Sequence, residues 1–251
     1  MLGQSYKMAA IYLIRHGQAS FGSADYDQLS EKGSKQAVIL GQFWRSSAVP
    51  HKFYSGDLLR HGQTLKGFTE GYQGQETPMI IHSGFNEFDH LDILTNYNKQ
   101  WKNFAAMSAA VNKLNDPNKT FQKEFANALN RWVSGDFDSE YQESWSKFKR
   151  RCIRALQDII KQELANSRKF VNNLSKTKTS KNILVFTSGG TISAIVQHIL
   201  QLSDHHALQI NQQSRNTSVT KLLFSEDMLS VDYLNNYNHL EQAGDNWITF
   251  R

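Results

Sequence analysis

The sequence predicts an α/β fold, a three-layer αβα sandwich with helices on both faces of a mostly parallel sheet. Three segments share one layout, in which a short continuous apolar run leads into a polar turn and then a helical pattern. Continuous apolar strands are typical of sheets covered on both faces, and strands that alternate with helices favour parallel pairing. The length fits a single domain over residues 1–251 that carries a helical insertion at about 90–145.

The first unit begins with an apolar strand at 10–14, and a helix is expected from about 30 to 46. Ser30 is the expected N-cap, because its hydroxyl can accept a hydrogen bond from a free backbone N–H group of the first turn. Apolar residues then recur on one helical face, which predicts that this face is buried.

The second and third units start with strands at 52–55 and 183–187. Asp57 is the expected cap of the second helix, and the third helix carries apolar residues at helical spacing from Ile192 to Leu200. The carboxyl ends of parallel strands meet at one edge of a sheet, where ligands bind. We therefore expect the three polar turns to share that edge.

The region after His90 has helical spacing in several stretches and predicts the insertion. Residues 166–182 are polar and lack acidic side chains, so we expect a surface loop there. A strand pattern at 217–224 is expected to extend the sheet, and the segment at 235–240 to close one edge.

A triplet of chemically active residues, Arg15-His16-Gly17, directly follows the first strand. A guanidinium group can hold phosphate oxygens with two parallel hydrogen bonds, and a neutral imidazole can attack phosphorus. The alternative is a histidine that only completes the end of the strand. Arg60, in the first turn of the second helix, is a second candidate for the phosphate. Its neighbour His61 points about 100° away on the helix, so we expect it to be structural or solvated.

Five segments, taken in order, resemble the histidine phosphatase superfamily, in its phosphoglycerate mutase-like branch. They are LIRHGQAS (13–20), LSEKGSKQA (29–37), YSGDLLRHGQT (54–64), FNE (85–87) and FTSGGTISAIV (186–196). The resemblance implies hydrolysis of phosphate monoesters through a phosphohistidine intermediate.

The resemblance also implies a role for each matching residue. His16 would attack phosphorus, Arg15 and Arg60 would bind the phosphoryl group, and Glu87 would protonate the leaving oxygen. This set agrees with the needs of phosphoryl transfer, which are positive charge around the equatorial oxygens, a nucleophile and a proton donor. Glu87 needs a raised pKa for this role, which burial beside its two phenylalanine neighbours would provide.

The sequence departs from the family pattern at Ser188, where a second histidine is expected before the glycine that opens the last helix. A hydroxyl can donate one hydrogen bond but carries no positive charge, so we expect a weakened phosphatase. The loss of one donor costs about 10²–10³ in rate, and the N–H groups that follow Gly189 partly compensate. Gln18 and Ser20, in the turn after the first strand, are further candidate phosphate donors.

Two alternatives to this interpretation remain open. The chain is an active phosphatase, or it is a catalytically silent module that binds a phospho-ligand or a protein. A mutase is disfavoured, because it must also bind a bisphosphate and this site has lost positive charge. His90 and His239 are candidates to replace the missing histidine, although no spacing singles out either one.

Composition excludes several classes of protein. The net charge of +5 favours acidic ligands, but no basic–aromatic alternation suited to nucleic acid is present. The lone cysteine, Cys152, cannot form an internal disulfide and is expected to be a buried, inert thiol. Histidines and acids at 82–92 match no common metal spacing, so we expect neither metal nor organic cofactor. Apolar runs are too short to span a membrane, and the first residues lack a signal-peptide layout, so we expect a cytoplasmic protein. The resemblance implies that its partner is a phosphorylated small molecule or phosphoprotein.

Overall fold

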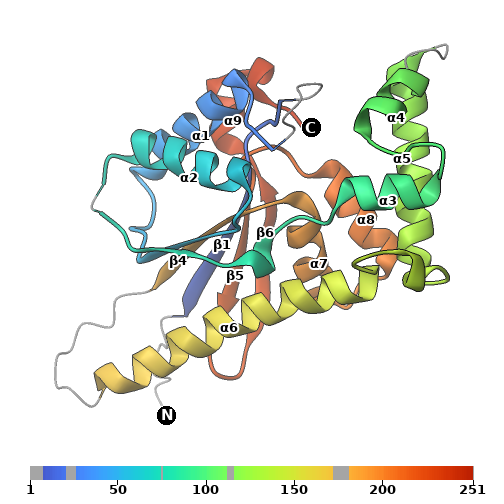
Figure 1. Cartoon of the computed structure of the whole chain (residues 1–251). Coiled ribbons are helices and arrows are strands. Elements are labelled where there is room, and N and C mark those ends of the chain that lie inside the picture. The colour runs from blue at the N-terminus through green and yellow to red at the C-terminus, as the bar shows by residue number, and fades with distance from the viewer. Residues whose placement is uncertain (1–7, 21–26, 75, 112–115, 172–180, 251) are drawn as a thin grey trace.

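A six-stranded sheet lies at the centre of the computed structural model, which describes residues 8–20, 27–74, 76–111, 116–171 and 181–250 (Figure 1). Its strands stand in the order β3-β2-β4-β1-β5-β6. They are β1 (Ala9–Arg15), β2 (Lys52–Ser55), β3 (Met79–Ile81), β4 (Asn182–Thr187), β5 (Val219–Phe224) and β6 (Leu229–Asn236). The helices are α1 (Glu31–Trp44), α2 (Leu59–Tyr72), α3 (His90–Tyr97), α4 (Phe104–Val111), α5 (Pro117–Ser134), α6 (Trp145–Val171), α7 (Gly189–Leu200), α8 (Asp204–Gln213) and α9 (Asn238–Ala243), with short 3₁₀ turns at η1 (Ser83–Phe85), η2 (Asp138–Glu140) and η3 (Asp245–Trp247).

Pairing within the sheet is mostly parallel, as predicted. β1 pairs with β4, β4 with β2 and β2 with β3 in parallel, whereas β5 and β6 add antiparallel strands on the other side of β1. The strand expected at 217–224 is β5. An element near the C-terminus does close one edge of the sheet, but it is β6, which ends at Asn236, and residues 238–240 of the segment expected at 235–240 belong to α9. β3 is only three residues long, and two of its side chains are exposed, so it is too short to be predicted from a sequence pattern.

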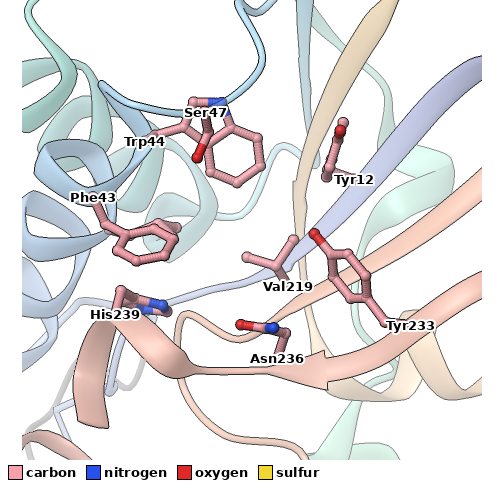
Figure 2. Close-up of a pocket in the computed structure, with 9 residues that line it drawn as sticks. Tyr12, Phe43, Trp44, Ser47, Val219, Tyr233, Asn236 and His239 are labelled. Carbon is pink, nitrogen blue, oxygen red and sulfur yellow. The ribbon is translucent and has the colours of Figure 1, made fainter. Parts of the chain in front are cut away.

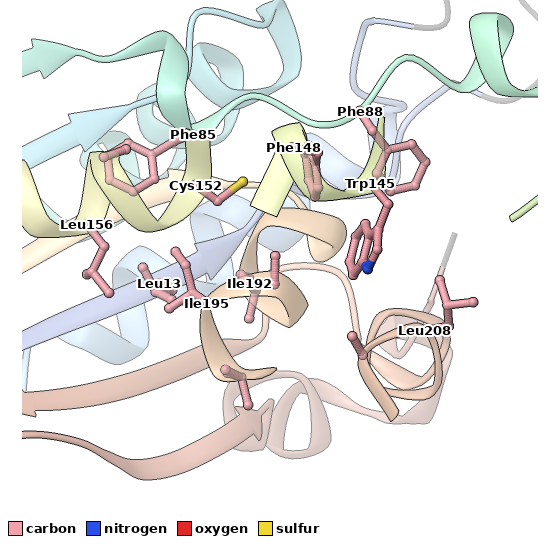
Figure 3. Close-up of a cluster of buried hydrophobic side chains, with 14 of the residues drawn as sticks. Leu13, Phe85, Phe88, Trp145, Phe148, Cys152, Leu156, Ile192, Ile195 and Leu208 are labelled. Atoms are coloured by element: carbon pink, nitrogen blue, oxygen red, sulfur yellow. The ribbon is translucent and has the colours of Figure 1, made fainter. Parts of the chain in front are cut away.

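Apolar side chains cover both faces of the sheet, which confirms the three-layer sandwich. Along β1, Ile11 and Leu13 belong to a large cluster with α6 and α7, whereas Tyr12 and Ile14 belong to a second cluster with α1 and α2. Figure 3 shows part of the large cluster, in which Leu13 lies opposite side chains of α6 and α7. Residues of the central strands are therefore buried whichever face they point to, which is why these strands read as continuous apolar runs.

The two helices that follow β1 and β2 begin in different ways. Ser30 caps α1 as predicted, because its Oγ accepts a hydrogen bond from the N–H group of Gly33 at 3.0 Å. The prediction that Asp57 caps α2 is wrong. The N–H group of Leu59 instead donates to Oδ2 of Asp27 at 2.8 Å. Asp27 is far from Leu59 in the sequence.

The helical insertion is confirmed and gathers at one side of the molecule, where α3, α4 and α5 precede α6 (Figure 1). Trp132 of α5 and Phe148 of α6 are buried in the large cluster together with Leu13 of the sheet. α6 continues to Val171, so the predicted loop at 166–182 is wrong over its first six residues, and 172–180 lie outside the described residues.

The apolar stripe of α7 is shorter than expected, and Cys152 is buried as expected. Leu200 is exposed, so the buried stripe of α7 ends before it. Cys152 is fully buried, and burial raises the pKa of its thiol to about 12, as expected of an inert thiol. Within the described ranges, no helix combines the length and the apolar character that crossing a bilayer requires.

Candidate active site

The polar turns that follow β1, β2 and β4 meet at one edge of the sheet, as the parallel pairing predicts. The N–H group of His16 donates to the carbonyl oxygen of Thr187 at 2.8 Å, which joins the first turn to the third. The imidazole rings of His16 and His61 lie 5.9 Å apart, and Nε2 of His61 is 2.6 Å from Oγ of Ser188. Side chains from three separate parts of the chain therefore share one site.

His16 is held in a defined tautomer. Its Nδ1 lies 2.7 Å from the carbonyl oxygen of Gly17, and because a carbonyl can only accept, Nδ1 carries the proton. Burial lowers the pKa of His16 well below its ordinary value, and the charges of Arg60 and Arg15 lower it further. The ring is therefore neutral at neutral pH, with the lone pair on Nε2.

Arg60 is buried, with 5% of its surface exposed, and it is anchored by a carboxylate. Its Nη1 donates to Oδ1 of Asp27 at 2.6 Å. Among the described residues, Nε of Arg60 is buried with no hydrogen-bond partner. Arg60 thus combines a fixed orientation with a donor that could serve an anion. Asp27 could not be predicted from a local motif, since its pairing with Arg60 depends on tertiary structure.

Arg15 reaches the site from the end of β1. Its Nη1 donates to the backbone carbonyls of Ser214 and Phe250, and these bonds fix the guanidinium. A Cβ atom at Gly189 would lie 3.4 Å from Nε of Arg15, so the start of α7 lies against this guanidinium. Two guanidinium groups and a helix N-terminus therefore concentrate positive potential here.

Glu87 also lies against the start of α7. Its Oε2 accepts a hydrogen bond from the N–H group of Gly190 at 3.1 Å. Burial raises the pKa of Glu87, whereas Arg60, this N–H group and Arg15 act in the opposite direction. The raised pKa expected from the sequence is confirmed, and it favours the protonated acid.

The loop that carries Glu87 is held from two sides. Oγ1 of Thr187 donates to the carbonyl of Phe85 at 2.6 Å, and Oγ1 of Thr191 donates to that of Asn86 at 2.9 Å. From α6, Nη1 of Arg151 donates to the same Asn86 carbonyl at 3.0 Å. Sequence reasoning missed Arg151 because it stands in a basic helical stretch that reads as a solvated face.

His61 is expected from the sequence to be structural or solvated, and the solvated alternative is wrong, because the side chain is buried beside Ser188. Its side chain has no exposed surface, and its Nε2 contacts Oγ of Ser188, which is also fully buried. Burial and the neighbouring charge of Arg60 lower the pKa of His61 well below its ordinary value. The 100° angle between neighbouring helical side chains does separate Arg60 from His61, but the turn before α7 brings Ser188 to the side on which His61 points.

The structure places two other sequence candidates less centrally. Oε1 of Gln18 accepts a hydrogen bond from Oγ of Ser30 at 3.1 Å, so this side chain supports the cap of α1. Ser20 is partly exposed, and its N–H group donates to the carbonyl of Gln28 at 2.8 Å.

The two candidate replacement histidines differ in position. The ring of His90 lies 4.6 Å from that of Phe88, and burial, with Arg60 and Arg15, lowers its pKa to about 3. His239 instead lines a cavity of about 170 Å³ on the α1 side of the sheet (Figure 2). Its Nε2 is 2.9 Å from Oγ1 of Thr217, so His239 has a structural partner.

Comparison with known proteins gives a family. The histidine phosphatase superfamily (branch 1) matches residues 11–113 and 113–237. A 2,3-bisphosphoglycerate-dependent phosphoglycerate mutase from Hamiltonella defensa is 24% identical over 92% of this chain and 94% of its own length. The crystal structure of phosphoglycerate mutase from Bacillus anthracis superposes with a TM-score of 0.63 at 17% identity, covering 95% of this chain and 98% of that one. A mutant phosphoserine phosphatase from Entamoeba histolytica, in complex with phosphoserine, has a TM-score of 0.57 at 18% identity and covers 93% and 100%. The match to the family spans most of the sequence, and the chain belongs to the histidine phosphatase superfamily.

Proposed function

We propose that this protein hydrolyses phosphate monoesters through a phosphohistidine at His16. The observation that carries the proposal is the state of His16, a buried neutral imidazole whose Nδ1–H group is bound to the Gly17 carbonyl. Its Nε2 lone pair is left to attack, and the positive charges of Arg60 and Arg15 are near enough to lower the pKa of the ring. A neutral nucleophile beside two fixed positive charges suits a phosphoryl group, whose three equatorial oxygens carry the negative charge.

In the first step, Nε2 of His16 forms a bond to phosphorus while the bond to the ester oxygen breaks. Glu87 gives its proton to the leaving oxygen, so the alcohol departs neutral. The raised pKa of Glu87 supports this role, because a larger fraction of the acid is protonated at a given pH. Arg15 and Arg60 would hold the phosphoryl oxygens as charge develops.

In the second step, a water molecule forms a bond to phosphorus while the bond to Nε2 of His16 breaks. Glu87, now a carboxylate, takes a proton from that water and returns to its starting state. The products are inorganic phosphate and the free enzyme. The ester and one water molecule are the only reactants, because the proton that Glu87 loses to the departing alcohol is replaced by a proton from that water.

The charge around the site supports a phosphatase more than a mutase. Ser188 is neutral, and Asp27 offsets part of the positive charge of Arg60 through its 2.6 Å contact. A mutase must hold a bisphosphate and protect the phosphohistidine from water, which calls for more positive charge. Among the structural relatives, a phosphoserine phosphatase in complex with phosphoserine supports a small phosphorylated substrate.

The purified protein tests this proposal with p-nitrophenyl phosphate and a panel of natural phosphate esters. We expect hydrolysis by the wild type and a loss of about 10³-fold or more in His16→Ala, which lacks the nucleophile. His198→Ala is the matched control, because His198 is exposed on α7. Equal inactivity of the wild type and His16→Ala across the panel would instead support a silent module that binds a phospho-ligand.

A further inference from the structure

His61 and Ser188 form a buried pair at the site that the proposed mechanism does not use. Both side chains are fully buried, and Nε2 of His61 lies 2.6 Å from Oγ of Ser188. The other ring nitrogen, Nδ1, is buried with no hydrogen-bond partner among the described residues. It faces the backbone at Gly56, where a Cβ atom would collide with it.

These contacts determine where the proton of His61 lies. A neutral imidazole carries one proton, and a buried N–H group without an acceptor costs about 1–3 kcal/mol. A proton on Nδ1 would be in that situation, whereas a proton on Nε2 has Oγ of Ser188 as its acceptor. Nε2–H of His61 therefore donates to Ser188.

The direction of this bond leaves the Ser188 hydroxyl proton available. Ser188 accepts from His61 and does not cap α7 with its side chain, since no N–H group of that helix donates to it. The hydroxyl proton can then be donated to a third group in the site. Hydrogen bonds arranged in a chain polarise one another, so a hydroxyl that accepts from an imidazole is a better donor than a lone one.

We propose that His61 is a positioning residue that orients and polarises the Ser188 hydroxyl as a donor to a phosphoryl oxygen. This inference rests on the proposed function and deepens it. No bond breaks and no proton moves along the pair, which acts by geometry and polarisation. This role gives His61 a function. The polarised hydroxyl also compensates in part for the positive charge that a serine lacks at position 188.

The contact between His61 and Ser188 also limits the size of the side chain that fits at position 188. Oγ of Ser188 lies at hydrogen-bond distance from the His61 ring, so an imidazole at position 188 has no room while His61 is present. Ser188→His alone should therefore lower activity. Ser188→His combined with His61→Ala nearly conserves volume and should recover activity relative to Ser188→His.

A double-mutant cycle tests the pair. His61→Ala, Ser188→Ala and the double variant are compared with the wild type by kcat/KM for p-nitrophenyl phosphate and by the Kd of vanadate from calorimetry. We expect each single change to lower kcat/KM about 10- to 100-fold and to weaken vanadate binding. Because His61 acts through Ser188, the double variant should be no worse than Ser188→Ala.

Conservative substitution separates positioning from packing. His61→Gln keeps an N–H donor within reach of Ser188, so it should retain more activity than His61→Ala, and it replaces His61→Ala in the cycle if that variant does not fold. Losses that multiply in the double variant would overturn the inference and leave the phosphatase proposal standing. If the wild type is inactive, the phosphatase proposal fails, and the vanadate cycle alone decides the inference. Multiplying losses in vanadate affinity, or no vanadate binding, would then overturn it.

Discussion

At the scale of single residues, two titratable groups have pKa values displaced in opposite directions. Burial lowers the pKa of His16 and raises that of Glu87, so burial favours the neutral form of both groups, one as a base and the other as an acid. The proposed first step needs His16 deprotonated and Glu87 protonated at the same time. Opposite shifts widen the pH range in which both conditions hold.

Removal of the proton donor tests this assignment. In Glu87→Gln, kcat/KM for an alkyl phosphate should fall about 10²–10⁴-fold, because a poor leaving group needs the proton. The loss should be smaller for p-nitrophenyl phosphate, whose leaving group departs readily as an anion. Glu70→Gln, at an exposed position on α2, is the control. Equal losses for both esters would contradict a proton-donor role for Glu87.

Sequence reasoning reaches the residues of the site that stand in short local motifs. Arg15 ends β1, and His16 and Ser188 directly follow β1 and β4, so their position at the sheet edge can be predicted from local pattern. His61 and Asp27 could not be assigned in this way, because their roles depend on contacts between distant segments. His61 meets Ser188 across the sheet edge, and Asp27 reaches Arg60 from the turn before α1.

At the scale of elements, the start of α7 serves two neighbours at once. Its Gly190 N–H group donates to Glu87, and at Gly189 it lies against Arg15. A Cβ atom at Gly190 would collide with Oε1 of Glu87 and with the ring of Phe88. Glycine at this position allows the carboxylate and the helix backbone to approach closely.

Substitution of Gly190 should lower activity, because it displaces Glu87, by more than a loss of folding stability would explain. Gly190→Ala should displace Glu87 and lower kcat/KM for an alkyl phosphate about 10²-fold or more. Gly62→Ala on α2 is the matched control, because a Cβ atom there meets nothing within 4 Å. We expect that control to stay active and to gain up to about 1 kcal/mol in free energy of unfolding. Wild-type activity in Gly190→Ala would contradict the placement of Glu87 against α7.

At the scale of the whole molecule, several histidines are buried in the neutral form. The pKa values of His16, His61, His90 and His239 are all lowered, with burial as the first cause, and those of His90 and His239 fall to about 3. In the unfolded chain a histidine has a pKa of about 6.5. Below that pH, the unfolded state binds protons that the folded state does not, so the free energy of unfolding should decrease as the pH falls from about 6.5 toward 3.

Denaturant unfolding at a series of pH values measures this effect. Each such histidine contributes a slope of up to about 1.4 kcal/mol per pH unit in that window. His239→Gln should reduce the slope, because it removes one group that must stay neutral, and His198→Gln, at an exposed position, should leave it unchanged. An identical slope in wild type and His239→Gln would contradict a neutral buried His239.

The architecture was predictable to the extent that burial leaves a local pattern. β1 and β4 are continuous apolar runs, β1, β2 and β4 are each followed by a helix, and Ser30 marks the start of α1. The short edge strand β3 and the cap that Asp27 gives α2 depend on tertiary contacts, so local pattern did not reveal them.

The most direct test of the central claim is identification of the group that receives the phosphoryl. The wild type is mixed rapidly with p-nitrophenyl phosphate, quenched in base and digested, and phosphopeptides are mapped by mass spectrometry. We expect a phosphate that is stable in base and labile in acid on the peptide that contains His16, and none in His16→Ala. Turnover that persists in His16→Ala, or a phosphate mapped to another residue, would contradict the account.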